Sequence, residues 1–148
     1  MPFSRPLQVF SLIFFIFMAQ TWANASEIKV YKSATCDCCS AWIEHLKDAG
    51  FEVSAENRTD MSALKTQYAV PQKLRSCHTA IVDGYVIEGH VPAADVQRLL
   101  KNKPDIMGLT APGMPMHSPG MQAKDQAPKD YDVIAFDQDG NQSVFSHY

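Results

Sequence analysis

Residues 28–50 read IKVYKSATCDCCSAWIEHLKDAG, and they contain the first predicted strand and helix of the chain. Ile28–Lys32 alternates in the manner of a strand and includes valine and tyrosine, which favour strands. Cys39–Ala49 carries apolar side chains at helical spacing and is followed by Gly50, a common helix stop. Three of the four cysteines lie where the strand gives way to the helix. The pattern predicts a cysteine-rich junction between the two elements.

A second strand and a second helix are predicted after Gly50. Phe51–Val53 predicts a second strand, which completes a β-α-β unit. Asp60 is a good N-cap for a second helix over Met61–Tyr68, which has to end before Pro71 because the residue preceding a proline disfavours the helical conformation.

A hairpin and a third helix follow. Thr79–Val82 and Tyr85–Glu88 flank Asp83-Gly84, and an Asp-Gly pair between two β-rich runs is a strong hairpin signal. Pro92 suits the first turn of a helix over Ala93–Leu100. The resulting order, β-α-β-α-β-β-α, is that of a thioredoxin-like α/β domain, and a cysteine cluster at the first strand-to-helix junction strengthens this interpretation.

Residues 101–130 break these patterns. Prolines and glycines recur throughout the segment, so we expect no regular element in it. Residues 104–130 are therefore predicted to form a loop rich in methionine, proline and glycine. Tyr131–Phe136 and Ser143–Tyr148, joined by a polar turn, predict a C-terminal hairpin.

Residues 1–25 have the pattern of an export signal. Arg5 supplies the positive charge, Val9–Ala19 is an apolar run, and Ala23-Asn24-Ala25 gives the small-x-small pattern before a cleavage point. The apolar run is shorter than the roughly 20 residues that a membrane anchor needs. We expect cleavage to leave residues 26–148 as one exported domain without a membrane segment, in an oxidising compartment if the source is bacterial.

The charge of the chain excludes one class of partner. The formal net charge is −3, and removal of Arg5 with the signal would make it −4, since no acidic residue is lost with it. Nucleic acids select basic surfaces, so we expect no nucleic-acid partner. The acidic balance also gives no reason to expect binding to an anionic membrane.

The cysteine cluster has two chemical interpretations. Cys36 and Cys39 have the C-x-x-C spacing of a redox dithiol, whereas Cys38 adds a third thiol that such a site does not need. A helix N-terminus stabilises thiolates, which are both nucleophiles and metal ligands. Two disulfides are a further option, although neighbouring cysteines are difficult to bridge to one another without strain.

Cys77-His78 is the second informative pair. It immediately precedes the predicted strand Thr79–Val82, and in a thioredoxin-like arrangement the loop entering that strand packs beside the redox junction. Cys77 is therefore predicted to face the cluster at residues 36–39. A disulfide from Cys77 to one of the cluster cysteines and a shared metal site both remain open.

The kind of metal follows from the softness of the donors. Three thiols within four residues cannot all bind one ion comfortably, but they can bridge several soft ions. Met114 and Met116 lie in an aperiodic loop that offers no helix face to fill, and thioethers together with thiolates favour Cu(I). His117 lies among the methionines and is a candidate additional ligand. His45 is expected on an exposed helix face without a role, and His90 in the second shell or in a turn.

Four motifs in order resemble a known family. They are Cys36-Asp37-Cys38-Cys39, Ser76-Cys77-His78-Thr79-Ala80, Gly89-His90-Val91-Pro92-Ala93 and Pro112-Gly113-Met114-Pro115. The chain is similar over residues 28–148 to the exported copper-resistance family often called CopG, long catalogued as a domain of unknown function.

The resemblance implies a thioredoxin-like fold, a periplasmic location and Cu(I) held by cysteines in a multinuclear cluster. The ligands that it implies are Cys36, Cys38, Cys39 and Cys77, with His78 and the loop methionines as further candidates. Copper ions and other periplasmic copper-handling proteins would be the partners.

Two functions follow from these observations. One is a copper-resistance protein that sequesters Cu(I) or changes its redox state. The other is a thiol–disulfide oxidoreductase in which Cys36 attacks and Cys39 resolves the mixed disulfide. Whether the protein is an enzyme stays open at this point, and a disulfide-stapled binding module without chemistry is a third option.

Overall fold

The computed structural model describes residues 26–148, so the predicted signal peptide at residues 1–25 lies outside the described part. No helix within residues 26–148 has the length and apolar character to cross a membrane. The elements in chain order are β1 (Ile28–Lys32), α1 (Asp37–Asp48), β2 (Val53–Asn57), α2 (Met61–Gln67), the 3-10 helix η1 (Gln72–Leu74), β3 (Thr79–Val82), β4 (Tyr85–Gly89), α3 (Ala93–Asn102), β5 (Gly108–Ala111), β6 (Asp132–Phe136) and β7 (Gln142–His147).

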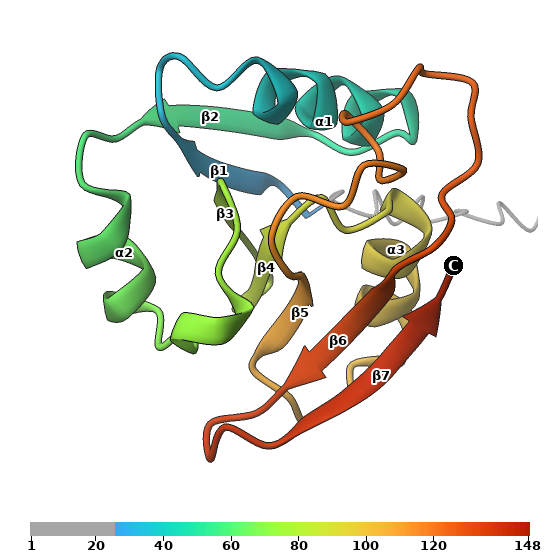
Figure 1. Cartoon of the computed structure of the whole chain (residues 1–148). Coiled ribbons are helices and arrows are strands. Elements are labelled where there is room, and N and C mark those ends of the chain that lie inside the picture. Colours follow the sequence, from blue (N-terminus) through green and yellow to red (C-terminus); the bar gives the residue numbers. More distant parts are fainter. Residues whose placement is uncertain (1–25) are drawn as a thin grey trace, which may run out of the picture.

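Residues 26–148 build one mixed α/β domain around a single seven-stranded sheet (Figure 1). The strand order is β2-β1-β3-β4-β5-β6-β7, with β1–β2 and β4–β5 parallel and the other neighbouring pairs antiparallel. From β1 to α3 the order of strands and α-helices is the predicted β-α-β-α-β-β-α, with η1 inserted before β3. β5, β6 and β7 extend the sheet beyond β4.

The helices cover the two faces of the sheet. Apolar residues of α1 and α3 share the main core with alternate residues of the central strands, such as Ala80 and Ile87. The neighbouring residues Ile81 and Val86 point to the other face, where they pack with Val70 between α2 and η1. Since successive side chains of a strand alternate between faces, α1 and α3 lie on one side and the α2–η1 segment on the other.

The segment expected to be irregular contains a strand, so that prediction was wrong for Gly108–Ala111. These residues form β5, which pairs in parallel with β4 and antiparallel with β6. All four residues of β5 are buried. Burial between two neighbouring strands stabilises this short segment although glycine and proline surround it.

Several element boundaries differ by a few residues from those predicted. The second strand begins at Val53 instead of ending there. α1 begins at Asp37, two residues before the predicted start at Cys39, and Asp37 places an acidic side chain in the first turn. The Asp60 cap is confirmed, because its carboxylate accepts a hydrogen bond from the Ala63 N–H at 2.9 Å.

The predicted C-terminal hairpin is also confirmed, as β6 and β7. It is tied to α3 through the buried Asp95, whose carboxylate accepts hydrogen bonds from Ser146 Oγ at 2.5 Å and from the Tyr148 hydroxyl at 2.9 Å. These bonds join the C-terminal residues to α3, which packs against one face of the sheet.

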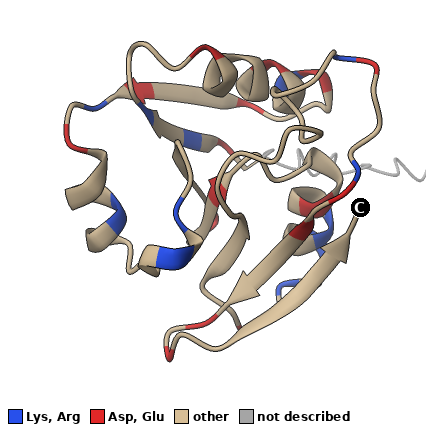
Figure 2. Cartoon of the chain, in the orientation of Figure 1, with Lys and Arg blue, Asp and Glu red and all other residues tan. Residues whose placement is uncertain are grey.

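A buried ion pair joins α2 to β4. Lys65 Nζ donates to Glu88 Oε1 at 2.5 Å, and the two side chains are 6% and 0% exposed. Thr79 Oγ1 accepts from Lys65 Nζ at 2.9 Å and donates to Glu88 Oε2 at 2.6 Å. Figure 2 shows the two charges as blue on α2 and red on β4. Glu88 also accepts from the Ser76 N–H at 2.6 Å, so the pair holds the loop that leads to Cys77.

The expectation that His45 lies on an exposed helix face without a role is wrong. It is half-buried, and its Nε2 accepts a hydrogen bond at 3.0 Å from the N–H of Ala93, the first residue of α3. Burial lowers the pKa of His45 from the ordinary value of 6.5, and the nearby Asp48 only partly opposes this effect. The neutral ring therefore links α1 to α3.

We expect the stability contributed by neutral His45 to be present above pH 6.5 and to be lost as the pH falls below that value, because the unfolded chain then binds the proton more readily. His45→Gln, whose amide oxygen can accept from Ala93, should lose less stability between pH 7.5 and 5 than the wild type. Urea unfolding at each pH measures this, with His147→Gln as an exposed control. Equal slopes for the His45 variant and the wild type would contradict the assignment.

Candidate metal centre

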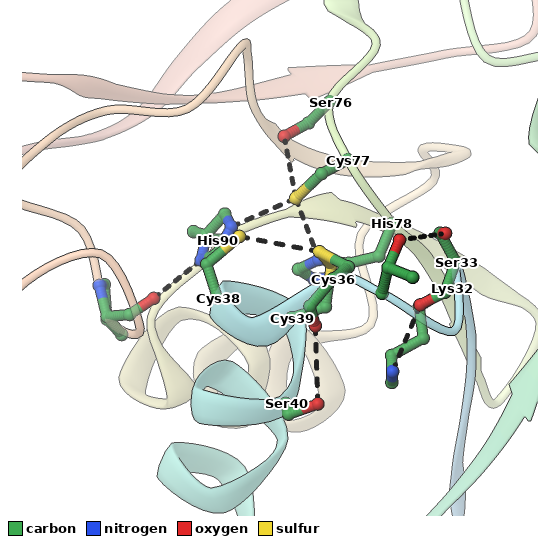
Figure 3. Close-up of a disulfide and its surroundings, with 12 residues drawn as sticks. Lys32, Ser33, Cys36, Cys38, Cys39, Ser40, Ser76, Cys77, His78 and His90 are labelled. Carbon is green, nitrogen blue, oxygen red and sulfur yellow. Dashed lines mark hydrogen bonds between the residues drawn. A yellow bond between two sulfur atoms is a disulfide. The ribbon is translucent and has the colours of Figure 1, made fainter.

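The site lies where α1 begins (Figure 3). Cys36 is the N-cap residue of α1, and Cys38 and Cys39 belong to its first turn. Cys77 comes from the loop that enters β3, as the sequence predicted. β1 and β3 are neighbours in the sheet, so the end of β1 that leads to α1 lies beside the start of β3.

The four cysteine sulfurs lie together. The Sγ atoms of Cys36, Cys38, Cys39 and Cys77 are all within 4.8 Å of one another. Cys39 is buried and the other three are half-buried. This places all four predicted cysteine ligands in one cluster that could hold a metal.

Two of the thiols are joined in a disulfide between Cys36 and Cys39. The expectation that the crowded cluster cysteines resist bridging to each other is therefore wrong for this pair. The three-residue spacing in the first turn of a helix brings the two Cα atoms to 5.3 Å, within the ordinary range for a disulfide. Cys38 and Cys77 are free, so the structure shows no disulfide between Cys77 and the cluster.

The disulfide sets what the cluster can do chemically. A disulfide sulfur is not a thiolate, and the thiolate is the form that binds metals. Reduction by two electrons and two protons converts the bond into the thiols of Cys36 and Cys39. Four thiols are then available at one point, whereas the oxidised protein offers those of Cys38 and Cys77.

Cys77 has a strongly perturbed thiol. Burial, with a smaller effect of the nearby Cys38 thiol, raises its pKa to about 11, although the contact with Ser76 Oγ acts in the opposite direction. Without a metal, this thiol stays protonated near neutral pH. A metal that binds there has to displace the proton, as is usual for cysteine ligands.

Two histidines also face Cys77. His78 Nδ1 lies 3.3 Å and His90 Nε2 lies 3.1 Å from Cys77 Sγ. The donor atoms of these three residues are within 4.8 Å of one another. Both rings are completely buried, and burial lowers both imidazole pKa values, that of His78 well below its ordinary range. Near neutral pH both rings are therefore uncharged and each keeps a lone pair for a ligand.

His90 was not among the predicted ligands. It follows β4, and the β3–β4 hairpin carries it back beside Cys77 although the two are thirteen positions apart in the sequence. The signal that could have identified it was the hairpin itself: Gly89 N donates to His78 O at 3.0 Å, which sets the chain after β4 against the chain before β3.

The other predicted ligands lie in the loop between β5 and β6. Met114 and Met116 are exposed, at 56% and 68%. His117 Nδ1 lies 3.1 Å from the Asp130 carboxylate, and it belongs to neither of the two groups of clustered donors found among residues 26–148. Copper binding by these three residues stays a prediction.

The loop between β5 and β6 nevertheless passes beside α1 (Figure 1). Gly120 has a positive φ of +86°, and a Cβ there would lie 2.8 Å from both Cys38 O and Trp42 N. The loop backbone therefore packs directly on the first turns of α1. Only glycine allows this approach.

We expect Gly120→Ala to destabilise the protein more than Gly113→Ala. Both glycines have positive φ, which costs a non-glycine residue about 1–2 kcal/mol, but a Cβ at Gly113 meets no atom within 4 Å. The clash at Gly120 should add about 1–3 kcal/mol, the usual cost of overpacking. Urea unfolding of the two variants measures the difference, and equal losses would show that the loop does not pack on α1 as described.

Comparisons with known proteins give one family model and two solved structures that the chain is similar to. The family model described as "Protein of unknown function, DUF411" matches residues 74–121, a range that includes Cys77, His78 and His90. A solved structure described as "Copper resistance protein copG- Form 2" is 42% identical, with a TM-score of 0.77, and the match covers 83% of this chain and 98% of that one. Form 1 of the same protein gives 43% identity and a TM-score of 0.76, over 82% and 96% of the two chains. The search of curated proteins found no match.

Proposed function

This chain belongs to the family of the copper resistance protein CopG, and on that basis we propose that it confers copper resistance by binding Cu(I). The proposed ligands are the thiolates of Cys36, Cys38, Cys39 and Cys77 in the reduced protein. Cu(I) is a soft ion, and thiolates are the softest ligands that a protein offers.

The observation that carries the proposal is the convergence of four sulfur atoms within 4.8 Å. Four thiolates so close to one another repel strongly unless cations neutralise them. Several Cu(I) ions bridged by shared thiolates would neutralise the site better than one ion. We therefore propose a multinuclear cluster. Met114, Met116 and His117 would take part in the delivery or release of copper and would not be ligands inside the cluster.

The proposal also includes where the protein acts and which class its fold belongs to. The pattern of residues 1–25 favours export to the periplasm, where other copper-handling proteins would supply or receive the ions. The strand order β2-β1-β3-β4 with α1 and α3 on one face supports a thioredoxin-like classification of the first half of the domain.

A second candidate function has one specific observation in its favour. The Cys36–Cys39 disulfide has the spacing and the helix-start position of a thiol–disulfide oxidoreductase. In that function Cys36 attacks and Cys39 resolves, and neither Cys38 nor Cys77 is needed. The two functions therefore differ in their dependence on Cys38.

We expect Cys38→Ser to impair Cu(I) uptake by the reduced protein more than it impairs reduction of a disulfide substrate such as insulin. The variant removes a cluster ligand but leaves the Cys36/Cys39 pair intact. Anaerobic Cu(I) titration and an insulin-reduction assay on the same samples measure both activities. Ser40→Ala, an exposed neighbour that offers no sulfur, is the matched control. If the variant takes up Cu(I) as the wild type does and still reduces insulin, the second function is the better one.

A further inference from the structure

We propose that a pocket between α1 and the β5–β6 loop binds a small, uncharged organic amide. The pocket has a volume of about 350 Å³, within the range of about 300–1,000 Å³ that small-molecule sites of proteins have. It contains none of the proposed copper ligands, and the proposal does not rest on the copper function. The chemical class of the ligand follows from the lining, from two polar groups without a partner and from the balance of charge.

One wall of the pocket is a single face of α1. Ala41, His45 and Asp48 line it, and their spacing of four and three residues makes them neighbours on the helix surface. The other wall is the part of the β5–β6 loop over residues 119–128, which passes beside α1 (Figure 1). Ala41 and the alanine and proline side chains of the loop supply apolar surface, so the body of the ligand is apolar and compact.

Three contacts hold the loop wall in place. The backbone of Gly120 packs so closely on α1 that a Cβ there would lie 2.8 Å from Trp42 N. The Pro119 carbonyl accepts a hydrogen bond from His90 Nδ1 at 2.8 Å, and Lys124 Nζ pairs with the Asp48 carboxylate at 2.7 Å. The pocket is therefore formed before a ligand arrives, which reduces the ordering that binding requires.

His45 offers the ligand a hydrogen-bond donor. The Ala93 N–H can only donate, so His45 Nε2 is the acceptor and the neutral ring carries its proton on Nδ1. Nδ1 has no hydrogen-bond partner in the described part of the chain. It is also not among the buried side-chain atoms that lack a partner, so it is open to solvent. A carbonyl oxygen of a ligand in the pocket can accept this N–H.

Gln122 offers an acceptor. It lines the same pocket, and its Oε1 is buried and has no hydrogen-bond partner within residues 26–148. Its Nε2 donates to Gln126 O at 2.8 Å, which fixes the orientation of the side-chain amide. A buried acceptor without a partner is costly, and an N–H of the ligand that donates to Oε1 would remove this cost.

The charged side chains of the pocket already have partners. Asp48 pairs with Lys124 at 2.7 Å, and Glu44 pairs with Lys47 at 2.9 Å. A charged ligand would therefore find no free ion of opposite sign, and the two carboxylates would oppose an anion. An amide places a carbonyl and an N–H side by side without a charge, and this matches His45 and Gln122.

Titration with benzamide, followed by NMR of the metal-free protein with its Cys36–Cys39 disulfide, tests the proposal. Benzamide joins a primary amide to a compact apolar ring. We expect saturable shifts at the His45 ring and at the Gln122 side-chain amide, and none at the His147 ring, which lies outside the pocket. Benzoate, which is charged and has no N–H, and toluene, which has neither polar group, should each bind at least about tenfold more weakly.

Ala41→Leu tests whether the shifts come from this pocket. The larger side chain would occupy the space of the ligand, so we expect the affinity for benzamide to fall at least about tenfold. Ala63→Leu is the matched control, because Ala63 is an exposed residue of α2 outside the pocket, and it should bind as the wild type does. Leucine favours helices, and circular dichroism of both variants checks that they keep their fold.

The proposal is overturned if benzamide causes no saturable shifts, or if benzoate or toluene binds as tightly as benzamide. It is also overturned if the shifts fall on His147 and spare His45, or if folded Ala41→Leu keeps the affinity of the wild type. The comparison of the three compounds and the position of the shifts need no substitution, so they decide the question even if a variant fails to fold. None of these outcomes bears on Cu(I) uptake, because all the measurements use metal-free protein.

Discussion

Lys65→Met will lower the free energy of unfolding by about 3–5 kcal/mol, the usual cost of removing one partner of a buried ion pair. The side chain of Glu88 is 0% exposed, and without Lys65 its carboxylate would stay buried with no cation against it. The hydrogen bonds from Thr79 and the Ser76 N–H cannot replace that charge. Urea unfolding at neutral pH measures the loss.

The matched control is Lys29→Met. Lys29 pairs with Glu56 at 3.1 Å, but these side chains are 50% and 40% exposed, so solvent screens the pair and we expect a much smaller loss than for Lys65→Met. The double variant Lys65→Met with Glu88→Gln should recover part of the loss, since the amide is uncharged and its oxygen can still accept from Ser76. A loss for Lys65→Met no larger than that for Lys29→Met would contradict the role given to the buried pair.

Cys77→Ser will lower the Cu(I) affinity of the reduced protein by at least about 100-fold. Loss of a group that merely supports a ligand costs 10–100-fold, and Cys77 is proposed to be a ligand itself. It is also the one donor that the four-cysteine cluster and the Cys77/His78/His90 group have in common.

Competition with a Cu(I) chelator measures the effect on affinity. Ser40→Ala serves again as the control, because it lies beside the cluster and removes no metal donor. Circular dichroism establishes that both variants keep their fold. Cu(I) affinity and stoichiometry equal to those of the wild type would remove Cys77 from the set of ligands.

Much of the fold could be predicted because its signals are local. The Asp60 cap and the Asp83-Gly84 turn depend on residues close together in the sequence, and both lie where the sequence places them. β5 could not be predicted in the same way. Its four residues are a strand because β4 and β6 pair with them, and neither partner is visible from the composition of Gly108–Ala111.

For the site, too, the residues with local signals could be predicted and the others could not. Cys36, Cys38 and Cys39 lie within four residues of the sequence, and Cys77 could be placed opposite them from the expected strand order. His90 needed the actual geometry, since its role depends on the 3.1 Å approach to Cys77 and on the hydrogen bond that orients its ring. The bridge between Cys36 and Cys39 depends on the geometry of the first helical turn, which begins earlier than the apolar periodicity of α1 indicated.

We propose that reduction of the Cys36–Cys39 disulfide creates a four-thiolate site for Cu(I). Anaerobic Cu(I) titration against a strong chelator, on reduced and on disulfide-bonded protein in parallel, tests it most directly. We predict that the reduced protein binds more than one equivalent and that the disulfide-bonded protein binds fewer and more weakly. No uptake by the reduced protein, or the same uptake by both forms, would contradict the account.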